Sequence, residues 1–172
     1  MTLSQAERDA LLAVAAGLAV EAGRTVLRGR REAGIAAATT KSSATDIVTE
    51  FDRASEAMIV AGLHEARPDD GIVGEEGTDT PGSSGVRWLV DPIDGTTNFL
   101  YDLAGWAVSI AARTDDGTQA GAVYLPVTDE LFTATLGGGA WCNGAPIRCS
   151  PATSLATSLI ATGFSYQPER RA

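Results

Sequence analysis

The first part of the chain carries apolar residues at helical spacing. Over residues 4–31 these positions recur every three or four residues, which predicts an amphipathic helix with its apolar face in the core. Ser4 and Glu7 have the spacing of a capping box at the start of this helix. The apolar positions are Leu11, Leu12, Val14, Leu18, Val26 and Leu27.

A second helical pattern follows the small and polar residues 34–45 and stops at Pro68, which cannot continue a helix. Asp46 or Thr49 is a suitable N-cap residue, and either would place Asp52 in the first turns. The apolar positions of this second helix are Phe51, Ala54, Met58, Ala61 and Leu63.

From residue 71 onward the pattern changes from helical spacing to short apolar or alternating runs. Gly, Pro, Asn and Asp clusters separate these runs, which is typical of strands joined by tight turns. Helices that come first and strands that follow predict an α+β layered fold, with the N-terminal helices packed on a mostly antiparallel sheet. The predicted strands are residues 71–74, 86–90, 106–112, 118–125, 130–135 and 159–162.

The bulk composition fits one globular domain. A chain of 172 residues that is 44% hydrophobic and 20% charged is long enough to form a real core. The apolar run of the first helix is interrupted by Gly17 and Glu21, so it is shorter than the roughly 20 residues that cross a bilayer. No basic segment precedes it, as a signal peptide would require. We therefore expect neither a membrane span nor secretion.

The cysteines and the charge restrict the environment and the partners. Cys142 and Cys149 are too few for a disulfide framework and have no histidine at zinc-site spacing, which favours a cytoplasmic protein. The net charge of −9 argues against direct nucleic-acid binding, which needs a basic surface. An anionic ligand would need cations to approach such a chain. The only lysine, Lys41, lies in a polar run before an acidic segment.

Residues 88–99 are the most informative stretch, because an apolar strand leads into two aspartates, a glycine and two threonines. Pro92 predicts that Asp91 ends the strand in an extended conformation and that the chain turns there. Asp91 and Asp94 could then direct carboxylates to one point, with the Ile93 carbonyl as a third oxygen donor. Hard cations such as Mg²⁺ prefer this donor set. The alternative is an Asp-Pro turn followed by an Asp-Gly turn, which needs no metal.

Gly95 allows close backbone approach, and the amides after it can begin a short helix with an anion site at its N-terminus. Three more acids occur at the ends of predicted elements: Asp52 near a helix start, and Glu75 and Glu76 after a strand. Taken singly, each fits an exposed strand end or a helix N-terminus. Taken together, five crowded acids repel one another and need cations.

Three ordered motifs combine these residues: Lys41–Asp52, Gly74–Glu76 and Asp91–Phe99. With the later segments Trp106–Ala111 and Gly139–Gly144, they resemble the inositol monophosphatase family over essentially the whole chain. The resemblance implies the layered α/β sandwich of inositol monophosphatase and fructose-1,6-bisphosphatase. It also implies Mg²⁺-dependent hydrolysis of a phosphomonoester by a metal-activated water that attacks in line, and a homodimer.

The leading substrate that the resemblance implies is inositol monophosphate. Histidinol phosphate, fructose 1,6-bisphosphate and a nucleotide 3′-phosphate remain alternatives within the family, although residues 97–99 are more similar to the inositol type. A function of another class is a non-catalytic interaction protein, since some bacterial members act as partners of the transcription machinery. A purely structural domain is the third hypothesis.

The resemblance also implies two to three Mg²⁺ ions with named ligands. Glu75, Asp91 and the Ile93 carbonyl correspond to ligands of the first ion. Asp91 and Asp94 correspond to ligands of the second, and Glu75 helps to hold a further, more loosely bound ion. Two ions of this kind can clamp the attacking and leaving oxygens of an in-line displacement.

The implied catalytic set is Asp52, Thr96 and Glu75, with Asp52 and Thr96 as the pair that orients the attacking water. Glu76 and Lys41 are expected next to the metal ligands without touching the metal. The residues implied to contact the substrate are Glu75, Ile93, Asp94, Gly95 and Thr96, the last two through backbone amides that donate to the phosphate.

One feature of the family pattern is missing. Family members carry a second, C-terminal half that supplies another aspartate, in a Trp-Asp context, to the second metal. This sequence contains no Trp-Asp pair. We therefore expect residues 1–172 to be an N-terminal metal-binding domain truncated before that half, with weak or no phosphatase activity by itself.

Overall fold

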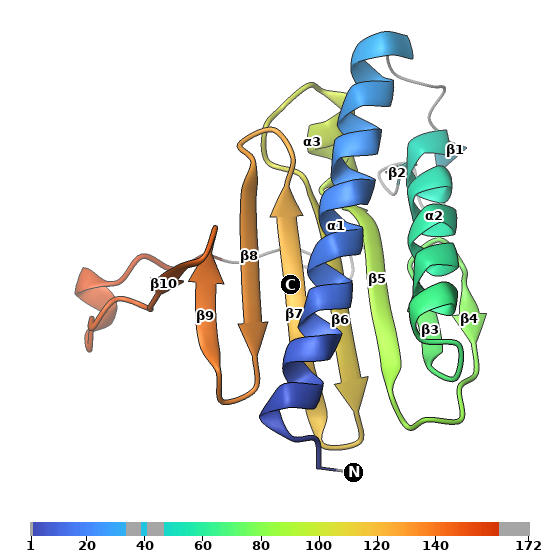
Figure 1. The fold of residues 1–172 in the computed structure, drawn as a ribbon. Helices are drawn as coiled ribbons and strands as arrows, with labels where there is room; N and C mark the ends of the chain where they lie inside the picture. Colours follow the sequence, from blue (N-terminus) through green and yellow to red (C-terminus); the bar gives the residue numbers. More distant parts are fainter. Residues whose placement is uncertain (1, 34–38, 41–46, 162–172) are drawn as a thin grey trace.

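The computed structural model describes residues 2–33, 39–40 and 47–161. Its main sheet has eight strands, and the two long helices, α1 and α2, pack beside each other against it (Figure 1). The predicted α+β class is confirmed. The elements are α1 (Gln5–Ala33), β1 (Thr39–Thr40), β2 (Ile47–Val48), α2 (Glu50–Ala66), β3 (Gly71–Gly74), β4 (Asp79–Thr80), β5 (Arg87–Asp94), α3 (Thr96–Leu100), β6 (Ala107–Thr114), β7 (Gly117–Leu125), β8 (Glu130–Thr135), β9 (Gly139–Cys142), β10 (Ala145–Ile147) and the 3₁₀ turn η1 (Leu155–Thr157).

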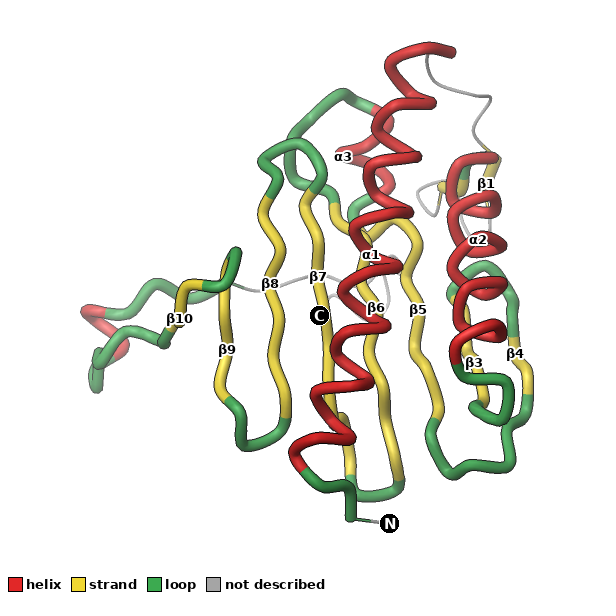
Figure 2. The backbone as a smooth tube through the Cα atoms, in the orientation of Figure 1, coloured by secondary structure: helices red, strands yellow, loops and turns green. Residues whose placement is uncertain are grey.

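The strand order of the main sheet is β10-β9-β8-β7-β6-β5-β3-β4 (Figure 2). All neighbouring strands are antiparallel except β3 and β5, which are parallel and aligned with Gly74 opposite Val90. The mostly antiparallel sheet expected from the sequence is therefore confirmed. Because β3 and β5 run in the same direction, the acidic residues that follow β3 lie beside the acidic end of β5.

Helix α1 approaches the sheet closely through small residues. Its predicted capping box is present, since the Ser4 amide donates to the Glu7 carboxylate at 2.7 Å. A Cβ atom on Gly23 would lie 2.7 Å from both Tyr124 and Pro126, so only glycine allows this approach. Leu12 and Leu18, two larger residues predicted for the apolar face, are only partly buried and pack against the core. The buried line along the helix is Leu11, Ala15, Ala19, Ala22 and Val26.

The buried face of α2 differs from the predicted one. Thr49 caps the helix, as one of the two candidates. However, Ala54 and Ala61 are exposed, and of the predicted positions only Leu63 is fully buried. The apolar spacing misled the prediction because polar residues with hydrogen-bond partners occupy the inner face of the first turns. The buried residues of α2 are Asp52, Ser55, Glu56, Ile59 and Leu63.

The strand predicted at residues 159–162 is wrong for its described part. Residues 159–161 form no strand, and Thr162 lies outside the described residues. Leu159 is fully exposed. An apolar run forms a strand only where a neighbour supplies hydrogen bonds, and no described strand pairs with these residues.

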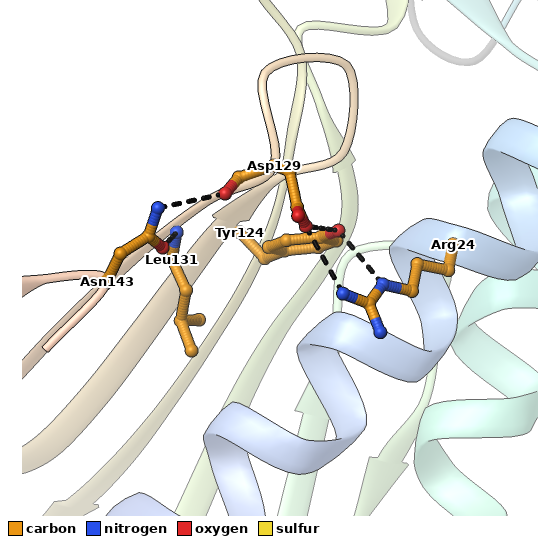
Figure 3. A network of polar contacts seen from close by, with 5 residues as sticks. All are labelled: Arg24, Tyr124, Asp129, Leu131 and Asn143. Carbon is orange, nitrogen blue, oxygen red and sulfur yellow. Dashed lines mark hydrogen bonds and ion pairs between the residues drawn. The ribbon is translucent and has the colours of Figure 1, made fainter.

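A polar network ties α1 to the turn between β7 and β8 (Figure 3). The Arg24 guanidinium donates to the Tyr124 hydroxyl and to the Asp129 carboxylate, both at 3.3 Å. The Tyr124 hydroxyl donates to Asp129 at 2.7 Å. Asn143 then holds the turn from the other side, since its amide group donates to the Asp129 carbonyl oxygen at 3.0 Å.

By length and composition alone, α1 contains an 18-residue stretch, with a mean hydropathy of 1.6, that could cross a membrane. This is weak evidence for a span, because core helices of globular proteins pass the same test. Here Ala15, Ala19 and Ala22 are fully buried in the core formed with the sheet.

Candidate functional site

The acidic end of β5 is built differently from the prediction. The strand does not end at Asp91 but continues to Asp94, and its pairing with β6 shifts between these two residues. Pro92 and Ile93 occupy this irregularity, where a ladder hydrogen bond is not needed. The predicted turn at Pro92 is therefore wrong. The Ile93 carbonyl lies at this irregularity and accepts a hydrogen bond from the Thr96 hydroxyl at 3.1 Å, so its role as the third oxygen donor stays a prediction.

Asp91 and Glu75 lie together at the ends of the parallel strands. The Glu75 amide donates to the Val90 carbonyl at 3.0 Å, which extends the β3–β5 contact by one residue and brings Glu75 alongside Asp91. Burial raises the pKa of Asp91 to about 8, and the adjoining Glu75 carboxylate adds to the rise by charge and hydrogen bonding. The Oδ1 atom of Asp91 is buried and has no hydrogen-bond partner.

An all-oxygen donor set with an unsatisfied buried carboxylate oxygen is chemically suited to a hard divalent cation. Among the described residues, no three His, Cys, Asp or Glu side chains are grouped closely enough to hold an ion as they stand. Asp94 is exposed and acts on Asp91 only through its charge. The suitability of the site for a divalent cation therefore depends on Glu75, Asp91 and the Ile93 carbonyl. Asp94 contributes only its charge.

Asp52 and Thr96 are hydrogen-bonded to each other, as the resemblance implied. The Thr96 hydroxyl is 3.2 Å from Asp52 Oδ1 and 3.1 Å from the Ile93 carbonyl oxygen, so its one proton can be donated to either. Asp52 is 1% exposed. Its other carboxylate oxygen accepts from the backbone amide and the hydroxyl of Thr49. The cap of α2 therefore fixes the carboxylate that contacts Thr96.

Gly95 sets the direction in which the chain leaves β5. Its φ of +87° is the left-handed region, and a Cβ atom there would lie 2.9 Å from the Gly105 carbonyl oxygen. Its own carbonyl accepts the Phe99 amide at 3.0 Å, which closes the first turn of α3. The predicted close backbone approach and the predicted short helix are both confirmed.

Glu75 and Asp91 line a hollow of about 360 Å³ together with Leu89 and Ser109. The neighbouring residues Trp88 and Ile110 lie in the helix-covered core, so the hollow opens mainly on the other face of the sheet. A larger hollow of about 630 Å³ lies at the opposite end of β5, around Arg87 and Arg113. We place the candidate site in the smaller hollow because it contains the paired carboxylates. Lys41 lies outside the described residues, so its predicted position beside the metal ligands stays a prediction.

One buried carboxylate was missed by the sequence reasoning. Glu56 is 4% exposed and accepts hydrogen bonds from the loop that carries Glu75 and Glu76. The signal was its spacing: residues 52, 55 and 56 continue the stripe of Ile59 and Leu63 toward the helix start. An acid at such a position is buried only if donors face it.

Known proteins of similar sequence and fold show which family this chain belongs to. The sequence profile described as the inositol monophosphatase family matches residues 7–172. The chain belongs to this family. The Nus factor SuhB of Salmonella typhimurium is 38% identical over 163 residues, which are 94% of this chain and 61% of that protein. The inositol-1-monophosphatase of Rhizobium meliloti is 39% identical over 160 residues, 92% of this chain and 60% of that protein.

A solved structure gives the same family assignment from the fold. The crystal structure of the extragenic suppressor protein suhB from Bartonella henselae superposes with a TM-score of 0.86 at 39% identity. The match covers 94% of this chain and 62% of that one. The chain therefore has the inositol monophosphatase fold over about three-fifths of the length of such relatives.

Proposed function

We propose that this member of the inositol monophosphatase family takes part in Mg²⁺-dependent hydrolysis of a small phosphomonoester. The observation that carries the proposal is the hydrogen-bonded Asp52–Thr96 pair, whose Thr96 hydroxyl also reaches the carbonyl of Ile93, two residues from the half-buried Asp91. Attack of water on a phosphate requires a group that accepts the water proton and a cation that neutralises charge. The Asp52–Thr96 pair and the oxygen ligands at the end of β5 would supply these two functions.

Glu75, Asp91 and the Ile93 carbonyl are the residues that would hold the first cation, and Asp91 with Asp94 would hold a second. When bound, Mg²⁺ would supply neutralisation of the phosphate charge and a lower pKa for a water molecule. Two or three ions are proposed, by resemblance to the family.

Thr96 and Asp52 would act on the attacking water. If the Thr96 hydroxyl donates its proton to Asp52, an oxygen lone pair stays free to accept a hydrogen bond from water. The water oxygen would then bond to phosphorus while the ester P–O bond breaks. The products are the free alcohol, which takes up a proton, and inorganic phosphate. The Gly95 and Thr96 amides are the proposed donors to the phosphate oxygens.

Inositol monophosphate is the proposed substrate, in line with the relative from Rhizobium meliloti that bears the name inositol-1-monophosphatase. Histidinol phosphate, fructose 1,6-bisphosphate and a nucleotide 3′-phosphate are the alternatives to assay in parallel. A cytoplasmic, homodimeric protein without direct nucleic-acid contacts completes the proposal. The free thiols of Cys142 and Cys149 support the reducing compartment.

The test is phosphate release from inositol 1-phosphate with and without Mg²⁺. We expect at most weak Mg²⁺-dependent turnover by residues 1–172, and its loss in Asp91→Asn, because a metal ligand supports several kcal/mol of charge stabilisation. Asp79→Asn removes an exposed acid from β4 and is the matched control, with unchanged turnover. Equal, measurable Mg²⁺-dependent turnover in Asp91→Asn and in the unsubstituted protein would refute the proposed site.

A second candidate function is favoured by the relatives named Nus factor SuhB. In that case the domain would serve as a non-catalytic interaction protein, associated with the transcription machinery, and the carboxylates would bind a metal without turnover. Mg²⁺ binding that depends on Asp91, in a protein that releases no phosphate from any of the four substrates, would favour this second function.

A further inference from the structure

The carboxylate of Glu56 lies directly behind the loop that bears Glu75. Its Oε2 atom accepts the Glu76 amide at 2.7 Å. Its Oε1 atom accepts the Thr78 amide at 3.2 Å and the Thr78 hydroxyl at 2.6 Å. All three donors come from the loop after β3 and none from α2, the helix that bears Glu56, so the loop alone satisfies this buried carboxylate.

Gly74 leaves room for this arrangement. A Cβ atom at Gly74 would lie 2.3 Å from the carboxyl carbon of Glu56 and 2.3 Å from Oε2. The φ of Gly74 is not positive, so an alanine is allowed by the backbone and is excluded only by the carboxylate. The side chain of Glu56 therefore occupies the space that a side chain on β3 would fill.

The loop is thus fixed on both sides of Glu75. The Glu75 amide is held by the Val90 carbonyl, and the next amide, that of Glu76, is held by Glu56. The Gly74 amide closes the turn by donating to the Thr78 carbonyl at 2.8 Å. With these bonds in place, the backbone from which the Glu75 carboxylate extends toward Asp91 has little freedom.

We propose that Glu56 is a positioning residue that holds the Glu75 loop in the geometry required for cation binding next to Asp91. This inference rests on the proposed function of the site, and it assigns Glu56 no contact with cation or substrate. Residues that orient metal ligands by hydrogen bonding affect metal affinity about 10- to 100-fold.

Replacement of Glu56 by glutamine changes one oxygen to an NH₂ group. The three loop donors that bond to Glu56 would still need acceptors, but the glutamine side chain has only one acceptor oxygen atom. If its oxygen faces Thr78, its NH₂ group faces the Glu76 amide, donor against donor. We therefore expect Glu56→Gln to release Glu76 while the rest of the fold is kept.

The experiment measures Mg²⁺ affinity by calorimetry and amide hydrogen exchange in the metal-free protein. Glu56→Gln should weaken Mg²⁺ binding about 10- to 100-fold and should speed exchange at Glu76 and Thr78 but not in β6 and β7. The matched control is Asp70→Asn. Asp70 is another buried carboxylate, at the other end of β3, which accepts from Arg67, Ser84 and Trp88. The Asp70→Asn substitution should lower thermal stability without changing Mg²⁺ affinity.

Gly74→Ala gives an independent test, in case Glu56→Gln folds poorly. The new methyl group should displace the carboxylate and reduce Mg²⁺ affinity to a similar degree. In a Glu56→Ala background the same methyl group should have little further effect, because the space is then empty. Such non-additivity is the signature of a direct contact.

The outcomes separate this inference from the proposed function. Mg²⁺ binding that Glu56→Gln weakens, in a protein without phosphatase activity, supports the role of Glu56 and removes only the proposed reaction. Equal Mg²⁺ affinity in Glu56→Gln, Asp70→Asn and the unsubstituted protein overturns the role of Glu56 even if turnover is observed. Failure of the unsubstituted protein to bind Mg²⁺ overturns both.

Discussion

Thr96 shows how much chemistry depends on one side chain. Its hydroxyl lies between the Asp52 carboxylate and the Ile93 carbonyl, so it links the helix α2, the strand β5 and the start of α3. Its proton can be donated in only one of the two directions at a time. Engagement of the Ile93 carbonyl by a cation would favour donation to Asp52, and that is the arrangement in which Thr96 can accept a hydrogen bond from water.

A glycine beside Thr96 gives a residue-scale prediction. Gly95→Ala would place a Cβ atom 2.9 Å from the Gly105 carbonyl oxygen at a φ of +87°. The left-handed conformation costs about 1–2 kcal/mol for a residue other than glycine, and the contact with backbone adds to it. We expect Gly95→Ala to lower the free energy of unfolding by more than ~2 kcal/mol, as measured by urea titration.

Gly139 offers the matched control for this change. It has the same φ of +87°, but nothing lies within 4 Å of the Cβ that alanine would introduce. Gly139→Ala should therefore show the conformational cost alone. Equal losses of stability in the two variants would show that the approach of Gly105 has no energetic effect.

At the scale of elements, α2 is a helix with two kinds of buried face. Its first turns bury polar groups that bond to the site, namely Asp52, Ser55 and Glu56, whereas Ile59 and Leu63 belong to the main core. The Ser55 hydroxyl donates to the Pro92 carbonyl oxygen at 3.3 Å, which attaches the helix to the irregular part of β5. One helix therefore supports the core at one end and positions the candidate site at the other.

The contact of α1 with the β7–β8 turn gives an element-scale prediction about pH. The Tyr124 hydroxyl, and then the Arg24 guanidinium, hold the pKa of Asp129 below its ordinary value. A carboxyl whose folded pKa is lowered stabilises the fold above its unfolded pKa of about 3.9, and this stabilisation is lost as the pH falls through the folded pKa. Asp129 has a φ of +54°, which asparagine tolerates.

We therefore expect Asp129→Asn to be less stable than the unsubstituted protein at pH 6, with a difference that shrinks as the pH falls below about 3.9. Urea unfolding at several pH values measures it. Asp115→Asn, at an exposed turn position, should show no such pH-dependent difference. A gap between Asp129→Asn and the unsubstituted protein that stays constant down to pH 3 would contradict the assigned role of the charged carboxylate.

At the scale of the whole molecule, the two long helices cover one face of the sheet (Figure 1). The hollow with Glu75 and Asp91 lies on the opposite face, lined also by Val73 and Leu89. The net charge of −9 opposes approach of a phosphate to this face. A bound divalent cation would reduce that repulsion at the place where the carboxylates are closest.

Cation binding should therefore stabilise the whole fold. A ligand that binds only the folded state at 100 times its Kd adds about 2.7 kcal/mol, which corresponds to a rise in Tm of about 5–10 °C for a domain of this size. We expect saturating Mg²⁺ to raise the Tm of the unsubstituted protein by this amount and to leave that of Asp91→Asn nearly unchanged. Similar shifts in both proteins would place the binding elsewhere.

The sequence alone was sufficient for the features that depend on neighbouring residues. Capping at Ser4, the short helix after Gly95, and the hairpin strands β6 to β8 follow from local spacing and turn residues, and all are confirmed. Thr49, one of the two candidate caps of the second helix, is the residue that caps it. The resemblance of the motifs predicts that Asp52, Glu75, Asp91 and Thr96 act together. In the structure Asp52 bonds to Thr96 and Glu75 adjoins Asp91, while the roles of all four remain proposals.

Only the tertiary structure decided the features that depend on distant partners. The pairing of β5 with β6 carries the strand past Pro92, where sequence rules predicted a turn. Donors on the β3–β4 loop allow Glu56 to be buried, and no pattern within α2 reveals those donors. Residues 159–161 lack a described strand to pair with, so their apolar character does not produce one. Whether a polar or apolar residue is buried depends on which groups the fold places opposite it, and this is a property of the whole chain.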